Sequence, residues 1–130
     1  MSNNILQDIK KLLNIDSNFN VFDTDIKIHI NSALATLKQL GVSEDKNFVL
    51  VTGEEVWSDF LGEDSGLDLE PVKTYVYIRV RILFDPPQSG YGIQSFEKMA
   101  QELEWRLNVL VDKEVEHDDQ KRGLDPTWVV

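Results

Sequence analysis

The stretch PVKTYVYIRVRILF, residues 71–84, constrains the fold more than any other part of the chain, because it suits two kinds of secondary structure. Every second residue from Thr74 to Phe84 favours a strand, and such alternation is typical of a half-buried strand. Apolar residues also recur there at the spacing of a helix face, namely Val72, Val76, Val80, Leu83 and Phe84. The choice between the two decides whether the chain contains a sheet.

The flanking residues favour the helix. Pro71 suits a first helical turn, where its missing N–H would have no partner. Fourteen residues are ordinary for a helix and long for a strand. Asp85 precedes Pro86, and a residue before proline is disfavoured in helical backbone, so the element ends there. We therefore predict a helix over residues 71–84.

Two helices are predicted in the first third of the chain. The first covers residues 3–14, with Asn3 as its N-cap. The second covers residues 23–40, with Asp23 as its N-cap and Gly41 directly after its end. Their apolar faces consist of Ile5, Leu6, Ile9, Leu12 and Leu13 in the first, and of Ile26, Ile30, Ala33, Leu34, Leu37 and Leu40 in the second.

The remaining elements complete a mainly α chain. A helical turn or two is predicted over residues 54–61, where Trp57 and Phe60 are three residues apart and Trp57 is expected in the core. A last helix covers residues 93–111, with the apolar face Phe96, Met99, Leu103, Leu107 and Leu110. The fold class is thus a small bundle of about four helices, with a possible short strand or hairpin at NFVLVTG and an extended C-terminal tail. We expect one helical domain over residues 1–111 and the tail over residues 112–130.

Composition excludes several classes of function. The net charge of −10, from 13 basic and 23 acidic residues, disfavours binding to nucleic acid and to anionic membranes. The absence of cysteine excludes disulfides, thiolate metal sites and cysteine nucleophiles. The first residues lack the pattern of a signal peptide, and no apolar run has the length of a membrane span, so neither is expected.

Motifs that carry chemistry are incomplete in this sequence. His29 and His117 have no third residue at a spacing that would form a triad or a metal site. DSNFNV begins like a calcium loop, but Val21 replaces the required glycine and Lys27 the final acid. GYGIQS lacks the third glycine and the preceding strand of a dinucleotide site. We expect no enzymatic activity, cofactor or metal; a hydrolase using Glu54, Glu55 and Asp59 is a remote alternative.

Several large or charged residues are predicted to contact other proteins. Arg79 and Arg81 would diverge by about 200° on a helix, so they cannot form one phosphate clamp. Their charges either point outward or pair with an acid of a neighbouring subunit. The expected subunit interface consists of Tyr75, Tyr77, Arg79, Arg81 and Trp105.

Five segments of the chain, taken in order, resemble the head–tail connector (adaptor) proteins of long-tailed phages that infect Gram-positive bacteria. These segments are ILQDIKKLLNI, FDTDIKIHINSALATLKQLGV, WSDFL, VKTYVYIRVRILFDPP and MAQELEWRLNV. The similarity covers about residues 5–110, and the combination of QLGV, WSDFL, LFDPP and ELEWRLN is fairly specific. Residues 112–130 have no match in this comparison.

The resemblance implies a helical structural subunit at the neck of the virion. Such proteins form a ring beneath the portal, usually of twelve copies, extend the DNA channel, and give the tail-completion proteins a docking surface. Genomic DNA would pass through without specific binding, and no membrane is involved. By position, portal binding would fall to Leu124, Pro126, Trp128 and Val130. The alternative is a small acidic regulator that mimics DNA, which would require its acids in dense rows; here they are scattered.

Overall fold

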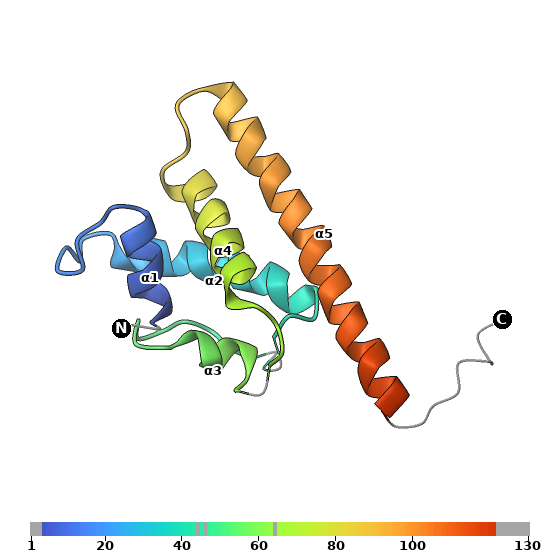
Figure 1. The fold of residues 1–130 in the computed structure, drawn as a ribbon. Coiled ribbons are helices and arrows are strands. Elements are labelled where there is room, and N and C mark those ends of the chain that lie inside the picture. The colour runs from blue at the N-terminus through green and yellow to red at the C-terminus, as the bar shows by residue number, and fades with distance from the viewer. Residues whose placement is uncertain (1–3, 44, 46, 64, 122–130) are drawn as a thin grey trace.

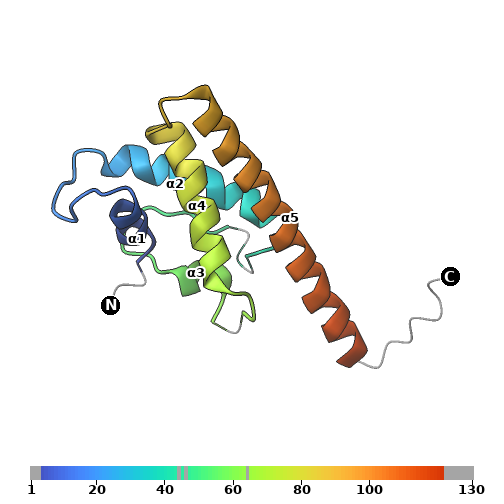
Figure 2. The ribbon, with the colours of Figure 1, turned by 45° about the horizontal axis from the view of Figure 1, so that its top comes forward.

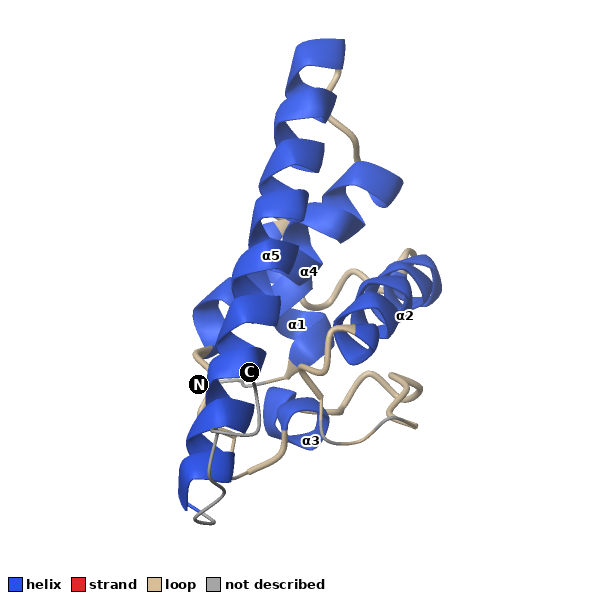
Figure 3. Cartoon of the chain, turned by 90° about the vertical axis from the view of Figure 1, so that its right-hand side faces the viewer, coloured by secondary structure: helices blue, strands red, loops and turns tan. Residues whose placement is uncertain are grey.

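The computed structural model describes residues 4–43, 45, 47–63 and 65–121. Across these ranges the chain forms α1 (Ile5–Leu12), α2 (Asp23–Gln39), α3 (Trp57–Leu61), α4 (Leu69–Phe84) and α5 (Gly90–Lys121), and no strand (Figures 1 and 3). Helix α4 is central: α2 crosses behind it and α5 runs along its other side (Figures 1 and 2). The predicted mainly α fold is confirmed.

Helix α4 resolves the ambiguous stretch as a helix, as predicted. Its N-cap is Asp68, whose carboxylate accepts a hydrogen bond from the Glu70 N–H at 3.2 Å. Its buried residues are Val72, Tyr75, Val76, Ile78 and Val80. They cover much of the helix circumference because α2 and α5 pack on different sides of α4. This burial explains why apolar residues also fit a strand-like alternation.

The starts of α1 and α2 differ from the predicted caps. Asn4 caps α1, its side chain accepting a hydrogen bond from the Gln7 N–H at 3.0 Å, whereas Asn3 lies outside the described residues. The N-cap of α2 is Phe22, and Asp23 lies inside the first turn. The prediction for Asp23 was wrong because its carboxylate pairs with the buried Lys10 ammonium, 2.9 Å away. Gly41 follows α2 with φ +84°, as predicted.

The predicted strand at residues 47–53 is absent, and side chains of α2 bind this extended segment instead. The Asn31 amide bonds both backbone groups of Leu50, accepting from its N–H at 2.8 Å and donating to its carbonyl at 2.9 Å. Lys38 donates to the Phe48 carbonyl at 2.8 Å. Phe48 and Leu50 are buried while Val49 is exposed. The backbone of this segment therefore has a helix rather than a strand as its partner.

In helix α5, Phe96, Leu103 and Leu107 face the core as predicted, but the helix differs from its prediction at two other positions and in length. Leu107 is buried, but Met99 is 44% exposed and its predicted place in the core is taken by Ala100. Leu110 is likewise exposed, and Val111 packs against the core. The helix continues to Lys121, so residues 112–121 are helical rather than part of an extended tail. These ten residues contain no glycine or proline and several strong helix formers.

Replacing Leu34 by alanine is expected to lower the free energy of unfolding by about 2–5 kcal/mol, because the change leaves a cavity at a side chain only 1% exposed in α2. Urea denaturation of the purified chain measures this loss. Ile28→Ala is the matched control in the same helix, since that side chain is 59% exposed and its loss is expected within about 0.5 kcal/mol. A loss below about 1 kcal/mol for Leu34→Ala would contradict its place in the core.

Candidate interaction surfaces

Reactive groups do not converge in the described part of the chain. No group of three or more His, Asp or Glu side chains there has a geometry that could hold a metal ion. The ring of His29 contacts that of Phe84, with centroids 6.3 Å apart. In the calcium-like segment, the Asp16 carboxylate accepts a hydrogen bond from the Asn18 N–H at 2.9 Å, which closes a local turn. His29 and the calcium-like segment thus make local contacts within the described residues.

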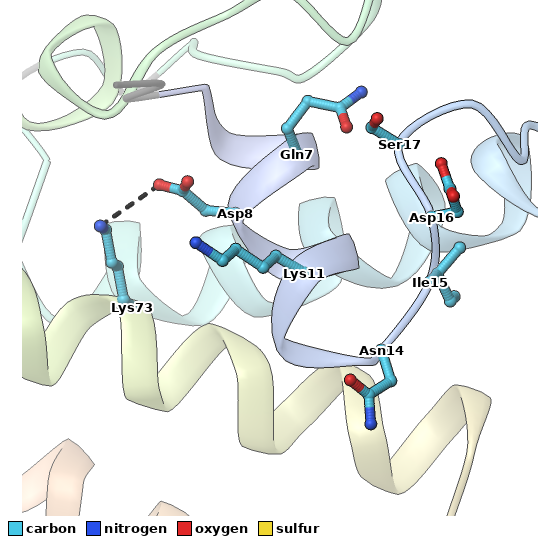
Figure 4. Close-up of a pocket in the computed structure, with 8 residues that line it drawn as sticks. All are labelled: Gln7, Asp8, Lys11, Asn14, Ile15, Asp16, Ser17 and Lys73. Carbon is cyan, nitrogen blue, oxygen red and sulfur yellow. Dashed lines mark ion pairs between the residues drawn. The ribbon is translucent and has the colours of Figure 1, made fainter.

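One open pocket of about 860 Å³ lies between α1, the loop after it, and α4 (Figure 4). Lys73 and Asp8 form an ion pair of 3.2 Å at its edge, and the Trp57 indole N–H donates to the same carboxylate at 2.8 Å. The pocket is lined by Gln7, Asp8, Lys11, Asn14, Ile15, Asp16, Ser17 and Lys73. The two lysines and two aspartates of this lining cancel in net charge. The Asp8 carboxylate joins α1 to α3 through the Trp57 hydrogen bond and to α4 through the Lys73 ion pair.

A buried lysine organises the loop between α1 and α2. Lys10 is 0% exposed, and its Nζ lies 2.9 Å from the Asp23 carboxylate. The same atom donates to the carbonyls of Phe19 at 2.9 Å and Ser17 at 3.3 Å. A buried ammonium needs such oxygen partners. The loop therefore wraps around a cation that the chain itself supplies, and this fixes the path of residues 13–22.

That loop presents an exposed apolar surface, the loop patch, which consists of Phe19, Val21 and Phe22. The Phe19 and Phe22 rings lie with centroids 5.7 Å apart, and Phe22 meets Phe84 edge to face at 5.4 Å. The patch thus continues from the loop onto the end of α4. A cluster of neighbouring exposed apolar side chains is typical of an interaction site.

Helix α5 exposes four large apolar side chains at different positions around its axis, namely Tyr91, Met99, Trp105 and Leu110, and the α5 outer face is the side of the helix that carries Trp105. Trp105 is 67% exposed. It stands two residues before the buried Leu107, so it points about 200° around the helix from the core. The α1–α2 loop and α5 lie at opposite edges of the molecule in Figures 1 and 2.

Tyr75 belongs to the core and not to the surface predicted for it. Its side chain is fully buried, and its hydroxyl donates to the Glu104 carboxylate of α5 at 3.0 Å. Burial and the neighbouring charge of Glu104 raise the pKa of Tyr75 to about 12, with Arg79 acting in the opposite direction. The phenol therefore stays neutral and donates a hydrogen bond that joins α4 to α5.

The other predicted interface residues are placed differently from one another. Arg81 donates to the Tyr77 hydroxyl of the same helix at 3.1 Å and lies over the Phe96 ring of α5 at 5.6 Å, so Arg81 helps to join α4 to α5. Arg79 is partly buried. Trp105 is exposed, as an interface residue should be. The tail residues Leu124, Pro126, Trp128 and Val130 lie outside the described residues.

The acids considered for hydrolysis have structural roles. The Glu55 carboxylate accepts hydrogen bonds from the N–H groups of Val51 at 2.8 Å, Thr52 at 3.1 Å and Gly53 at 2.9 Å. Burial acts to raise the pKa of Glu55, but these backbone bonds together outweigh it and lower the pKa to about 2. Asp59 accepts from the Val56 N–H at 3.0 Å at the start of α3. Neither carboxylate faces a shared reaction site.

Glu55→Gln is expected to lower the free energy of unfolding by about 1 kcal/mol at neutral pH, because a neutral amide binds the three N–H groups less strongly. The pKa of Glu55 is lower in the folded chain, about 2, than its ordinary 4.5. The contribution of the Glu55 carboxylate to the free energy of unfolding is therefore complete above about pH 4.5 and is lost as the pH falls through about 2. Urea denaturation across this range measures the difference between the two proteins. A difference that stays constant with pH would contradict the role of the carboxylate.

The described residues define a class of protein: a mainly helical chain that exposes large apolar side chains on the α1–α2 loop and on α5. A family model described as Phage connector protein matches residues 5–114. The chain therefore belongs to the phage connector protein family, as its sequence predicted, and its role is that of a structural connector in the virion, in contact with other virion proteins. No curated protein and no solved structure matches the chain. No helix in the described residues has the length and apolar character needed to cross a membrane.

Proposed function

We propose that this connector is a head–tail adaptor that assembles as a ring beneath the portal, extends the DNA channel, and offers a docking surface to the tail-completion proteins. The observation that carries the proposal is the exposure of Trp105 and its neighbours on the α5 outer face of a family member. Large exposed aromatic side chains act as anchors in protein interfaces. A subunit held on several sides by other virion proteins needs such surfaces.

The acidic balance of the chain supports a role as a conduit rather than as a DNA-binding protein. A net charge of −10 repels the phosphate backbone, so DNA can move past without being held. A DNA mimic would instead need its acids in ordered rows on one face. Several carboxylates serve the fold, including Asp8, Asp23, Glu55 and Glu104. The structure therefore offers no observation that favours the regulator.

Electron microscopy of the purified protein mixed with portal rings tests the adaptor function. The expected result is a collar of added density at the narrow end of the portal, with ring symmetry. A buffer-matched sample of portal alone is the control. Folded protein that leaves intact portal rings without added density would remove the adaptor proposal.

We also propose that the C-terminal segment, residues 122–130, holds the connector on the portal. Deleting it, or replacing Trp128 by alanine, is expected to weaken co-sedimentation with portal rings at least tenfold, because a buried tryptophan anchor contributes about 2 kcal/mol or more. Thr127→Ala is the matched control. The urea midpoint of each variant should equal that of the parent chain. Portal binding by the truncated chain at parental affinity would contradict the assignment.

A further inference from the structure

Helix α5 is attached to the rest of the chain more sparsely than α2 and α4 are. Within residues 90–112, the part of α5 whose side chains are described, Ala100 and Leu107 are the fully buried ones. Helices α2 and α4 each bury five side chains over 17 and 16 residues. Helix α5 packs mainly along α4 at one edge of the fold, and Val111 lies against Gly41 beyond the end of α2 (Figures 1 and 2). Few buried side chains therefore hold the longest helix of the described structure in place.

Polar links hold the body of the fold together without α5; the body is defined here as α1–α4 with their loops. The Asp8 carboxylate joins α1 to α3 and to α4. The Lys10 ammonium joins α1 to the start of α2, and the Asn31 side chain of α2 binds the backbone of Leu50. None of these groups contacts α5 through the bonds named. All of these links would therefore persist if α5 moved away from α4.

The side-chain links between α5 and the body are few among the described residues, and they lie along one side of α4. The Tyr75 hydroxyl donates to the Glu104 carboxylate at 3.0 Å, and the Arg81 guanidinium lies over the Phe96 ring at 5.6 Å. The ion pair between Arg106 and Glu102, at 2.7 Å, joins two residues of α5 itself and adds nothing to its attachment. Separation of α5 from α4 thus breaks one hydrogen bond and a limited apolar contact.

We propose that α5 is a strap over α4, which opens as one unit while the body stays folded. A segment with few buried apolar contacts opens at a lower free energy than the whole protein unfolds. Ile78 lies three residues after Tyr75 and three before Arg81, on the side of α4 that α5 covers, and it is 1% exposed. Opening of the strap uncovers Tyr75 and Ile78. The position of α5 therefore determines whether this side of α4 can contact another molecule.

Native-state hydrogen exchange of the purified chain, followed by NMR at single amides, tests the strap and does not depend on the adaptor function. In the parent chain, the amides of residues 96–110 should report one common opening of α5. The equilibrium constant for that opening should be at least tenfold larger than the constant for the slowest amides of α2 and α4. A strap requires this difference, because α5 opens while those two helices remain closed.

Two conservative variants distinguish a strap from a helix that unfolds only with the whole chain. Ile9→Val shortens a fully buried side chain of α1, which lies across α4 from α5 (Figure 1). It should speed exchange in α2 and α4 about two- to tenfold and leave α5 unchanged, because the open strap keeps α1 packed. Tyr75→Phe removes the hydrogen bond to Glu104 and should speed exchange about tenfold in α5 and in the body alike, because both openings break that bond.

Three results would contradict the strap. An equal increase in α5 and in the body for Ile9→Val would show that the chain unfolds as a single unit. Exchange that quickens gradually toward one end of α5, with no common opening, would show fraying of a helix end instead. Unchanged exchange of α5 in Tyr75→Phe would show that its amides exchange without separation from α4.

Discussion

Replacing Lys10 by methionine is expected to lower the free energy of unfolding by about 3–5 kcal/mol, although the two side chains are similar in length. The ammonium is fully buried, and methionine cannot donate to the carbonyls of Ser17 and Phe19 or neutralise Asp23. Removal of one member of a buried ion pair leaves the other uncompensated. Urea denaturation at neutral pH measures the loss.

Lys11→Met is the matched control, because Lys11 is the next residue of α1 and its side chain is exposed; its effect is expected within about 0.5 kcal/mol. A double variant, Lys10→Met with Asp23→Leu, should recover only part of the loss, because two carbonyls still lack a donor. Equal stability of the Lys10→Met and Lys11→Met variants would show that the ammonium does not hold the loop.

Local signals were sufficient to predict most of the helices. Pro71 and the Asp85–Pro86 boundary identified α4 despite its strand-like alternation, because terminal signals depend on backbone geometry and not on what the helix packs against. Gly41 marked the end of α2 for the same reason. The apolar run around Phe48 and Leu50 suggested a short strand, but a local pattern cannot reveal that Asn31 of α2 would bind this backbone instead.

Tertiary contacts explain the residues that were misplaced. Lys10 and Lys11 are chemically alike and adjacent, so nothing local indicates that only Lys10 is buried. Tyr75 was expected at an interface, yet Glu104, twenty-nine positions away, provides the partner that lets its hydroxyl enter the core. In α5 the apolar pattern favoured Met99, while the close approach of α4 selects the small Ala100.

The two exposed apolar surfaces were predicted unequally. Trp105 was identified because it lies off the main apolar face of its helix, and the structure places it in solvent. The loop patch was not predicted, since the polar residues of DSNFNV indicated only an incomplete calcium loop. A usable signal was present: Phe19, Val21 and Phe22 are large apolar residues in an otherwise polar segment, and a loop offers no periodic face to bury them.

Trp57→Ala is expected to lower the free energy of unfolding by about 3–5 kcal/mol, because this side chain is 1% exposed and is the largest in the core. Trp57→Phe separates its two contributions. Phenylalanine retains most of the packing but cannot donate to Asp8, whose carboxylate also pairs with Lys73, so a smaller loss of about 1–3 kcal/mol is expected. Urea denaturation of both variants measures these losses.

Trp105→Ala is the control of the same residue type, because the Trp105 indole is exposed. The free energy of unfolding of the isolated chain should fall by no more than about 0.5 kcal/mol in this variant. The two tryptophans should therefore behave in opposite ways. Trp57 variants should unfold more easily and, below their unfolding midpoint, still join a collar, whereas Trp105 variants should remain stable and lose assembly. A stability loss at Trp105 equal to that at Trp57 would mean that the α5 outer face is part of the subunit core, and the assignment of Trp105 to contacts with other virion proteins would then be wrong.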